Sequence, residues 1–169
     1  LIVYPGKKPG ASYTIPSTVT SIRYYGFAGN SFLTSMNIPN TLTTLGGQAF
    51  LYSQVLTTVS IGTGLTELGV QAFSSLPTLT SITVDPANTS FASIDGVLYD
   101  KEISRLLSYP AGKAGGSYVA PSTVTSTDYT VFGGTVNLLT ADLSSIYELT
   151  GQEFSGSTSI QEVIFGDSL

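Results

Sequence analysis

Carboxylates are the side chains through which this sequence could do acid–base chemistry. It contains no histidine and no cysteine, so the commonest general base, the commonest metal ligand and the thiolate nucleophile are all missing. Of the acids, Asp142 and Glu162 could lie on adjacent strands, close enough for one pKa to rise. A glycosidase needs two carboxylates at a set separation in a cleft, and the sequence predicts no cleft. We therefore interpret these acids as solvated, and predict that the protein is not an enzyme.

The sequence contains no complete phosphate-binding or metal-binding motif. The segment 62–64 reads Gly-Thr-Gly, but Glu67 stands where a third glycine would be needed and no Lys-Ser or Lys-Thr follows. Asp85, Asp95 and Asp100 are too irregularly spaced for a calcium loop. The sequence predicts no cofactor, no metal and no catalytic residue.

Composition excludes further classes of partner. The chain has 169 residues, only 6 Lys and Arg against 11 Asp and Glu, and a net charge of −5. Nucleic-acid binding needs clustered basic residues, so it is not expected. No apolar run of about 18 residues is present, so membrane insertion of this segment is not expected either.

The elements that position these side chains belong to a repeat. Phe27, Phe50 and Phe73 are 23 residues apart, and each carries apolar neighbours at the same spacing. The pattern resumes at Phe132 and again, one residue early, at Phe154. A fixed period of this length is typical of a solenoid, in which each unit buries its apolar face on the next.

Each repeat contains one segment with the period of a half-buried strand, such as Leu-x-x-Met-x-Ile at 33–38. Successive strands run in the same direction, so they should be parallel and about 4.8 Å apart. The segment 42–45 suggests a second, shorter strand, and Gln-Ala-Phe at 48–50 suggests a helical or 3₁₀ turn on the outer side.

These motifs carry a resemblance. Ile-Pro-Ser-x-Val-x-x-Ile at 15–22, Ala-Phe at 49–50 and Leu-Thr-Ser-Ile at 79–82 resemble the BspA-like leucine-rich repeat family of bacterial and protist surface proteins. The resemblance implies one leucine-rich-repeat solenoid over residues 1–169, with short parallel strands, outer turns of helical or 3₁₀ type and short outer strands. It also implies secretion to the cell surface and a role in adhesion.

An insertion interrupts the repeats. Between the third and fourth units the spacing exceeds 23 residues by 13, which predicts an inserted β-hairpin at about 94–110 with strands at 97–99 and 106–108. This insertion, too, resembles one typical of the family, and residues 1–5 resemble the second arm of another such hairpin. The charged tip of the hairpin at 94–110 has two interpretations: it covers an edge and aids solubility, or it is a contact point for a partner.

Candidate binding residues flank the buried strand positions and should face outward on the concave sheet. Most carry small hydroxyl groups, which also have a structural reason because Thr suits a strand. Tyrosines outside the apolar register form a second candidate surface, at positions 24, 25, 52, 129 and 147. The strand-face candidates are Ser35, Asn37, Thr58, Ser60, Ser81, Thr83, Thr140, Asp142 and Glu162.

The sequence thus suggests an extracellular module that binds a host or neighbouring-cell protein. The alternatives are a structural spacer with no ligand of its own and a glycan-binding module. Both ends are repeat sequence without polar caps, so we expect an excerpt of a longer protein or end-to-end self-association.

Overall fold

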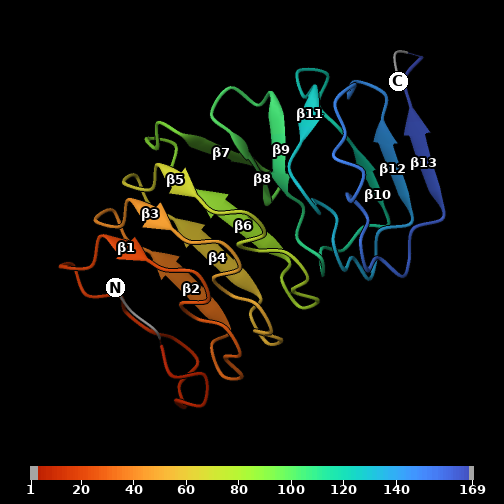
Figure 1. Cartoon of the computed structure of the whole chain (residues 1–169). Coiled ribbons are helices and arrows are strands. Elements are labelled where there is room, and N and C mark those ends of the chain that lie inside the picture. The colour runs from red at the N-terminus through yellow and green to blue at the C-terminus, as the bar shows by residue number, and fades with distance from the viewer. Residues whose placement is uncertain (1–3, 168–169) are drawn as a thin grey trace.

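The repeats stack side by side as a solenoid of short β-strands. In the computed structural model of Figure 1, the strands of successive repeats lie next to one another. The structure describes residues 4–167, and within that range the only regular elements are thirteen strands. Leu1, Ile2 and Val3, which the hairpin-arm prediction for the start of the chain includes, lie outside the described residues.

The principal strands of the first half form one parallel sheet in the order β2 (Ser35–Ile38), β4 (Thr58–Ile61) and β6 (Ser81–Val84). Their register is shifted by 23 residues at each step, which aligns Met36 with Val59 and Val59 with Ile82. Because side chains alternate across a strand, these three are buried while their neighbours face out. The predicted parallel strands are confirmed.

The second, shorter strands are confirmed as well. They are β1 (Ser21–Ile22), β3 (Thr44–Leu45) and β5 (Glu67–Leu68), and they form a separate parallel sheet in that order. Ile22 and Leu45 are buried in the core, and Leu68 is partly buried against it.

The predicted helical or 3₁₀ turn at 48–50 is wrong: neither an α-helix nor a 3₁₀-helix occurs among residues 4–167. Gln48 and Tyr52 have φ values of 49° and 62°, which a right-handed helix cannot include. The backbone amides here bond between repeats instead. Phe27 donates to the carbonyl of Ala49 at 2.8 Å, and Gln48 donates to that of Val70 at 3.0 Å. The turns of successive repeats are therefore hydrogen-bonded to one another, in addition to the two sets of parallel strands.

The insertion contains the predicted hairpin and one strand more. The hairpin strands β8 (Val97–Asp100) and β9 (Arg105–Ser108) are antiparallel, as expected, and β7 (Phe91–Ile94) pairs with the other side of β8. The turn between β7 and β8 covers the edge of β6, since the Ile82 amide donates to the carbonyl of Gly96 at 2.9 Å. The sheet β2–β4–β6 therefore ends here.

A second set of parallel strands follows the insertion. These strands are β10 (Ser117–Val119), β12 (Thr140–Leu143) and β13 (Glu162–Phe165), while β11 (Ser126–Thr127) pairs in parallel with β9. Buried side chains form two clusters, one on each side of the insertion.

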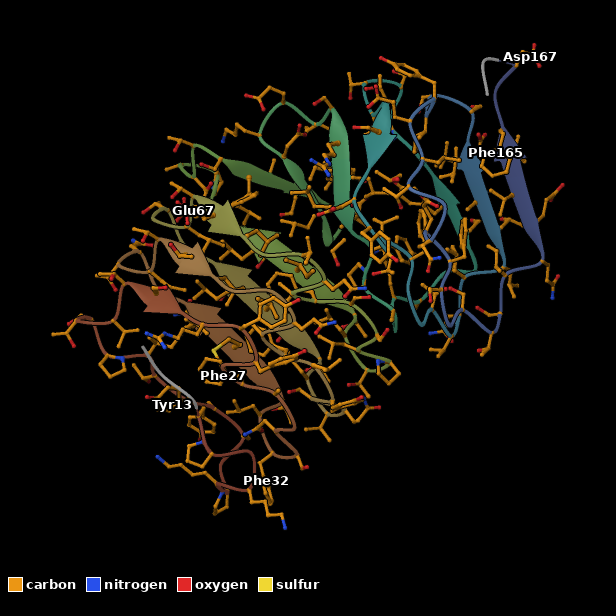
Figure 2. The ribbon with its side chains drawn as sticks, in the orientation of Figure 1. Tyr13, Phe27, Phe32, Glu67, Phe165 and Asp167 are labelled. Atoms are coloured by element: carbon orange, nitrogen blue, oxygen red, sulfur yellow. The ribbon has the colours of Figure 1, made fainter. Side chains whose placement is uncertain are left out.

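The repeated phenylalanines form the spine of the core. The ring of Phe50 is stacked between those of Phe27 and Phe73, with centroids 5.4 and 5.7 Å away. Phe27 is followed at the outer end by Tyr13, whose ring lies 5.9 Å away (Figure 2). In the second half Phe132 stacks on Phe154 at 4.8 Å. These contacts confirm the register drawn from the 23-residue period.

Candidate protein-binding surfaces

Six of the nine candidate residues come together on the outward face of β2–β4–β6. They line a shallow hollow of about 290 Å³ that contains no charged side chain. Ser60 donates a hydrogen bond to Asn37 across the strands at 3.1 Å. We call this surface the hydroxyl face; its residues are Ser35, Asn37, Thr58, Ser60, Ser81 and Thr83.

Hydroxyl groups one residue apart on this sheet differ in their bonding. Thr57 and Thr80 donate to the backbone carbonyl of the preceding repeat, at 2.7 and 3.0 Å. The hydroxyls of Ser35 and Thr58 are exposed and have no hydrogen-bond partner within residues 4–167. The first pair holds the repeats together, whereas the second pair is free to bond to another molecule.

Thr140, Asp142 and Glu162 lie apart from the hydroxyl face. They belong to β12 and β13, in the sheet beyond the insertion. The nine candidates therefore do not form the single continuous strip that an unbroken row of strands would give. The reason is the β7–β8 turn, which covers the edge of β6.

The acid pair does not behave as a dyad. The two acids lie on adjacent strands, as expected, but Asp142 is aligned with Ile164 and Glu162 with Thr140, so the two carboxylates are diagonal neighbours and not directly opposite each other. Hydrogen bonds from the hydroxyl and the backbone amide of Ser144 hold the pKa of Asp142 below its ordinary value. The prediction that proximity could raise a pKa is therefore wrong for Asp142.

All five candidate tyrosines remain exposed. The rings of Tyr24 and Tyr25 contact each other edge to face, with centroids 4.8 Å apart. Tyr52 is the most exposed of the set, at 69%. Tyr129 and Tyr147 lie in the second half of the chain, so the five rings are spread over many turns of the solenoid.

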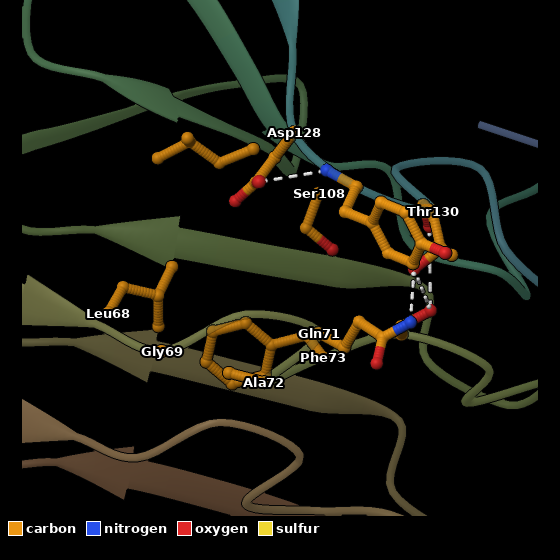
Figure 3. Close-up of a pocket in the computed structure, with 11 residues that line it drawn as sticks. Leu68, Gly69, Gln71, Ala72, Phe73, Ser108, Asp128 and Thr130 are labelled. Atoms are coloured by element: carbon orange, nitrogen blue, oxygen red, sulfur yellow. Dashed lines mark hydrogen bonds between the residues drawn. The ribbon is translucent and has the colours of Figure 1, made fainter. Parts of the chain in front are cut away.

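A groove that sequence reasoning missed lies between β5 and β9. It has a volume of about 460 Å³ and continues into the pocket drawn in Figure 3. The length of the insertion was a signal for it, because the extra chain forms β9, which lies across the groove from β5. We call it the inter-sheet groove; it is lined by Thr66, Glu67, Leu68, Phe91, Asp100, Arg105, Leu107 and Asp128.

One end of the inter-sheet groove is closed by contacts between turns. The side-chain amide of Gln71 donates to the hydroxyl of Thr130 at 3.2 Å, and Ser74 shares a hydrogen bond with the same hydroxyl at 3.0 Å (Figure 3). The Ser75 amide donates to the carbonyl of Gly133 at 3.2 Å. The third and fourth repeats thus touch at the turns, although their strands are parted.

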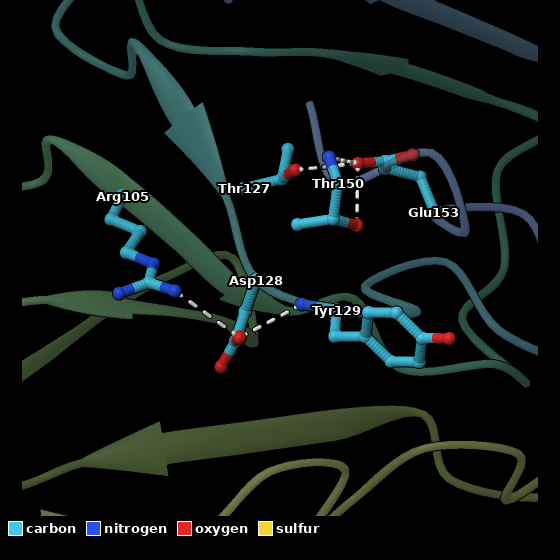
Figure 4. Close-up of polar contacts among 6 residues, drawn as sticks. All are labelled: Arg105, Thr127, Asp128, Tyr129, Thr150 and Glu153. Atoms are coloured by element: carbon cyan, nitrogen blue, oxygen red, sulfur yellow. Dashed lines mark hydrogen bonds and ion pairs between the residues drawn. The ribbon is translucent and has the colours of Figure 1, made fainter. Parts of the chain in front are cut away.

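Charged groups gather at the other end. Arg105 and Asp128 form an ion pair with N and O 3.3 Å apart, and the same carboxylate accepts from the Tyr129 amide at 2.8 Å (Figure 4). Among the described residues no group of acids is arranged to hold a metal ion. No helix long and apolar enough to cross a membrane occurs there either.

Glu153 is a nearly buried carboxylate that holds the last turn. It accepts hydrogen bonds from the hydroxyl of Thr127 at 3.0 Å and from the hydroxyl and amide of Thr150 (Figure 4). It also accepts one from the amide of Gly151 at 3.0 Å. Burial alone would raise its pKa. Hydrogen bonds from its own amide, from Thr150 and from Thr127 outweigh burial and hold the pKa below its ordinary value of 4.5.

Because of Glu153, the free energy of unfolding should depend on pH. Because its pKa is lower in the folded state, its contribution is complete above pH 4.5 and is lost as the pH falls through the folded pKa. At neutral pH we expect Glu153→Gln to lower the free energy of unfolding by about 1–3 kcal/mol, since an amide offers one acceptor oxygen in place of two. Thermal melts of both proteins from pH 7 to pH 3 measure the difference. A gap that stays constant across this range would contradict the assignment.

Stacked parallel strands, an aromatic spine and an inserted hairpin define a leucine-rich-repeat solenoid. The family model described as BspA type Leucine rich repeat region (6 copies) matches residues 7–98, which are 92 of the 169 residues. The chain belongs to this family, and the resemblance seen in its sequence motifs is confirmed.

Solved structures agree with this fold. A leucine rich cell surface protein from Faecalibacterium prausnitzii A2-165 is 27% identical with a TM-score of 0.81, over 92% of this chain and 41% of that one. The pneumococcal vaccine antigen PcpA is 23% identical with a TM-score of 0.71, over 98% and 54%. A leucine-rich repeat protein from Eubacterium ventriosum ATCC 27560 is 17% identical with a TM-score of 0.55, over 92% and 60%.

The chain thus spans between 41% and 60% of the length of these three structures. At 23% and 17% identity, PcpA and the Eubacterium protein are similar in fold alone. No curated protein sequence matches the chain significantly.

Proposed function

We propose that this chain is an adhesion-type module of a cell-surface protein, which binds a protein of a host or neighbouring cell through the hydroxyl face. The free hydroxyls of Ser35 and Thr58 carry the proposal, because the solenoid does not use them for its own bonding. Membership of a family of surface repeats, and a similar protein described as a cell surface protein, support an extracellular location. The proposal assigns the chain no enzymatic activity.

The chemistry of the hydroxyl face suits a polar, uncharged contact. Ser and Thr hydroxyls both donate and accept, so they can pair with the peptide groups and side chains of a partner. Their short side chains lose little conformational entropy on binding. Absence of charge on this face means that recognition would depend only weakly on salt.

Substitution of Thr58 tests the proposal. The side chain is exposed at the centre of the hydroxyl face, so Thr58→Arg should block contact without disturbing the core. Against immobilised extracellular-matrix proteins, we expect the unaltered chain to bind at least one and Thr58→Arg to bind about tenfold more weakly or worse. Biolayer interferometry measures both.

Thr41→Arg is the matched control. Thr41 is exposed in the loop after β2 and does not line the hydroxyl face, so this variant adds the same charge without obstructing it. Its binding should equal that of the unaltered chain. If Thr58→Arg bound matrix proteins as tightly as the unaltered chain, the hydroxyl face would not be the binding surface. If the unaltered chain bound no matrix protein, the alternative of a structural spacer without a ligand would be favoured.

A further inference from the structure

The free edge of β5 opens into the inter-sheet groove. Along the first half of the stack each later strand donates to the earlier one, as when Gly46 donates to the carbonyl of Ile22 at 2.8 Å and Gly69 to that of Leu45 at 2.7 Å. The next carbonyl in this series is that of Leu68. It accepts no hydrogen bond from any residue between 4 and 167, and neither does that of Thr66.

The strand across the groove cannot satisfy this edge. On one side β9 pairs with β11, where Asp128 donates to the carbonyl of Leu106 at 2.8 Å. On its other side β9 pairs with β8. Both edges of β9 are therefore occupied, and β5 remains an edge strand with unpaired backbone groups, the kind of edge to which another chain can add.

The side chains that line the groove specify what could occupy it. Leu68, Phe91 and Leu107 supply apolar contact. The same lining includes Glu67, Asp100 and Asp128, which carry three negative charges against the single positive charge of Arg105. Three minus one leaves two uncompensated negative charges in a groove of about 460 Å³.

From this geometry we propose that the inter-sheet groove binds an extended, basic segment of a partner protein. The segment adds to β5 as a further strand, its amides donate to the carbonyls of Thr66 and Leu68, and its Lys or Arg side chains lie against Glu67. Apolar side chains on its other face contact Leu68 and Leu107. A second copy of this chain is a poor occupant, because the chain is acidic, with a net charge of −5.

This site is separate from the hydroxyl face and goes beyond the function proposed above. A fluorescent peptide of about eight residues that alternates Val and Lys is the probe, since it has the strand period and the charge. Its counterpart with Glu in place of Lys has the same period and the opposite charge. Fluorescence anisotropy at low and at high salt measures binding; we expect the Lys peptide to bind more weakly at high salt and the Glu peptide not to bind.

Backbone pairing is tested with two copies of the Lys peptide, each N-methylated on a different alternate set of amides. One set faces β5 and the other faces away, so one copy should lose about tenfold in affinity and the other should bind normally. Equal binding of both copies would overturn strand addition to β5.

Glu67→Arg tests the charge. Glu67 is exposed, and its only side-chain partner within the described chain is the hydroxyl of Thr44, so the fold should tolerate this change. We expect affinity for the Lys peptide to fall about tenfold. Glu102→Arg, which makes the same change at the exposed hairpin tip outside the groove, should bind normally. Equal binding by Glu67→Arg and the unaltered chain would overturn the proposal, and Thr58→Arg should leave peptide binding intact.

Discussion

Replacing Phe50 with alanine should lower the free energy of unfolding by about 3–5 kcal/mol. The side chain is only 1% exposed and lies between the rings of Phe27 and Phe73. Its removal leaves a cavity in the middle of the spine, where rigid strands on both sides prevent collapse. Because each repeat depends on its neighbours, the loss weakens two interfaces at once. Urea denaturation followed by circular dichroism measures the effect.

Phe32→Ala is the matched control for this prediction. Phe32 is 42% exposed, and Figure 2 places it at the margin of the stack, away from the spine. The same atoms are removed, but little buried surface is lost, so the change should stay within about 1 kcal/mol. Similar losses for the two variants would mean that the aromatic spine contributes no more than ordinary surface contact.

Gly69→Ala should destabilise the protein by about 3 kcal/mol, at the upper end of overpacking. A methyl group at position 69 would overlap the backbone nitrogen of Gly47 and lie 2.6 Å from the carbonyl carbon of Gly46. Both atoms belong to the backbone of the preceding repeat, so neither can rotate away. The two repeats would have to move apart, which would break the hydrogen bond from Gly69 to Leu45.

Gly29→Ala separates this steric effect from backbone strain. Gly29 has a φ of 67°, and a methyl group at this position would have no atom within 4 Å, so only the left-handed conformation penalises alanine there. We expect a cost of about 1 kcal/mol. Thermal melts of the two variants compare them directly, and a Gly69→Ala protein as stable as Gly29→Ala would refute close packing of the glycines.

Sequence periodicity predicted the strands well because the physics behind it is local. Met36 and Ile38 are two residues apart and must face one side of any strand, so burial of that side follows directly. The hairpin was predictable for a similar reason, since 97–99 and 106–108 are close in sequence and joined by a charged turn. Strand β7 escaped notice because Phe91-Ala-Ser-Ile94 offers little alternation beyond its two ends.

Features that depend on distant parts of the chain were not predictable. The segment 48–50 has a composition that suits a helical turn, but the amide of Gln48 is satisfied by Val70 in the next repeat. Similarly, nothing in the sequence of β5 indicates that its edge is free. That edge is free because β9 is occupied by β8 and β11, and such pairings are decided only when the whole stack is assembled.

The turn contacts across the insertion have a mechanical consequence. Strands run across the stack and their hydrogen bonds run along it, so a pull along the stack stretches these bonds rather than shearing them. At the insertion no strand of the first half pairs with β10 or β11, and the two halves are joined by single contacts such as Gln71 with Thr130, Ser75 with Gly133 and Ile82 with Gly96 of the hairpin. We therefore expect the stack to part first at this plane under tension, because no ladder of strand hydrogen bonds crosses it. The hairpin would lose packing in such a separation, since Leu98 belongs to one buried cluster and Tyr99 to the other.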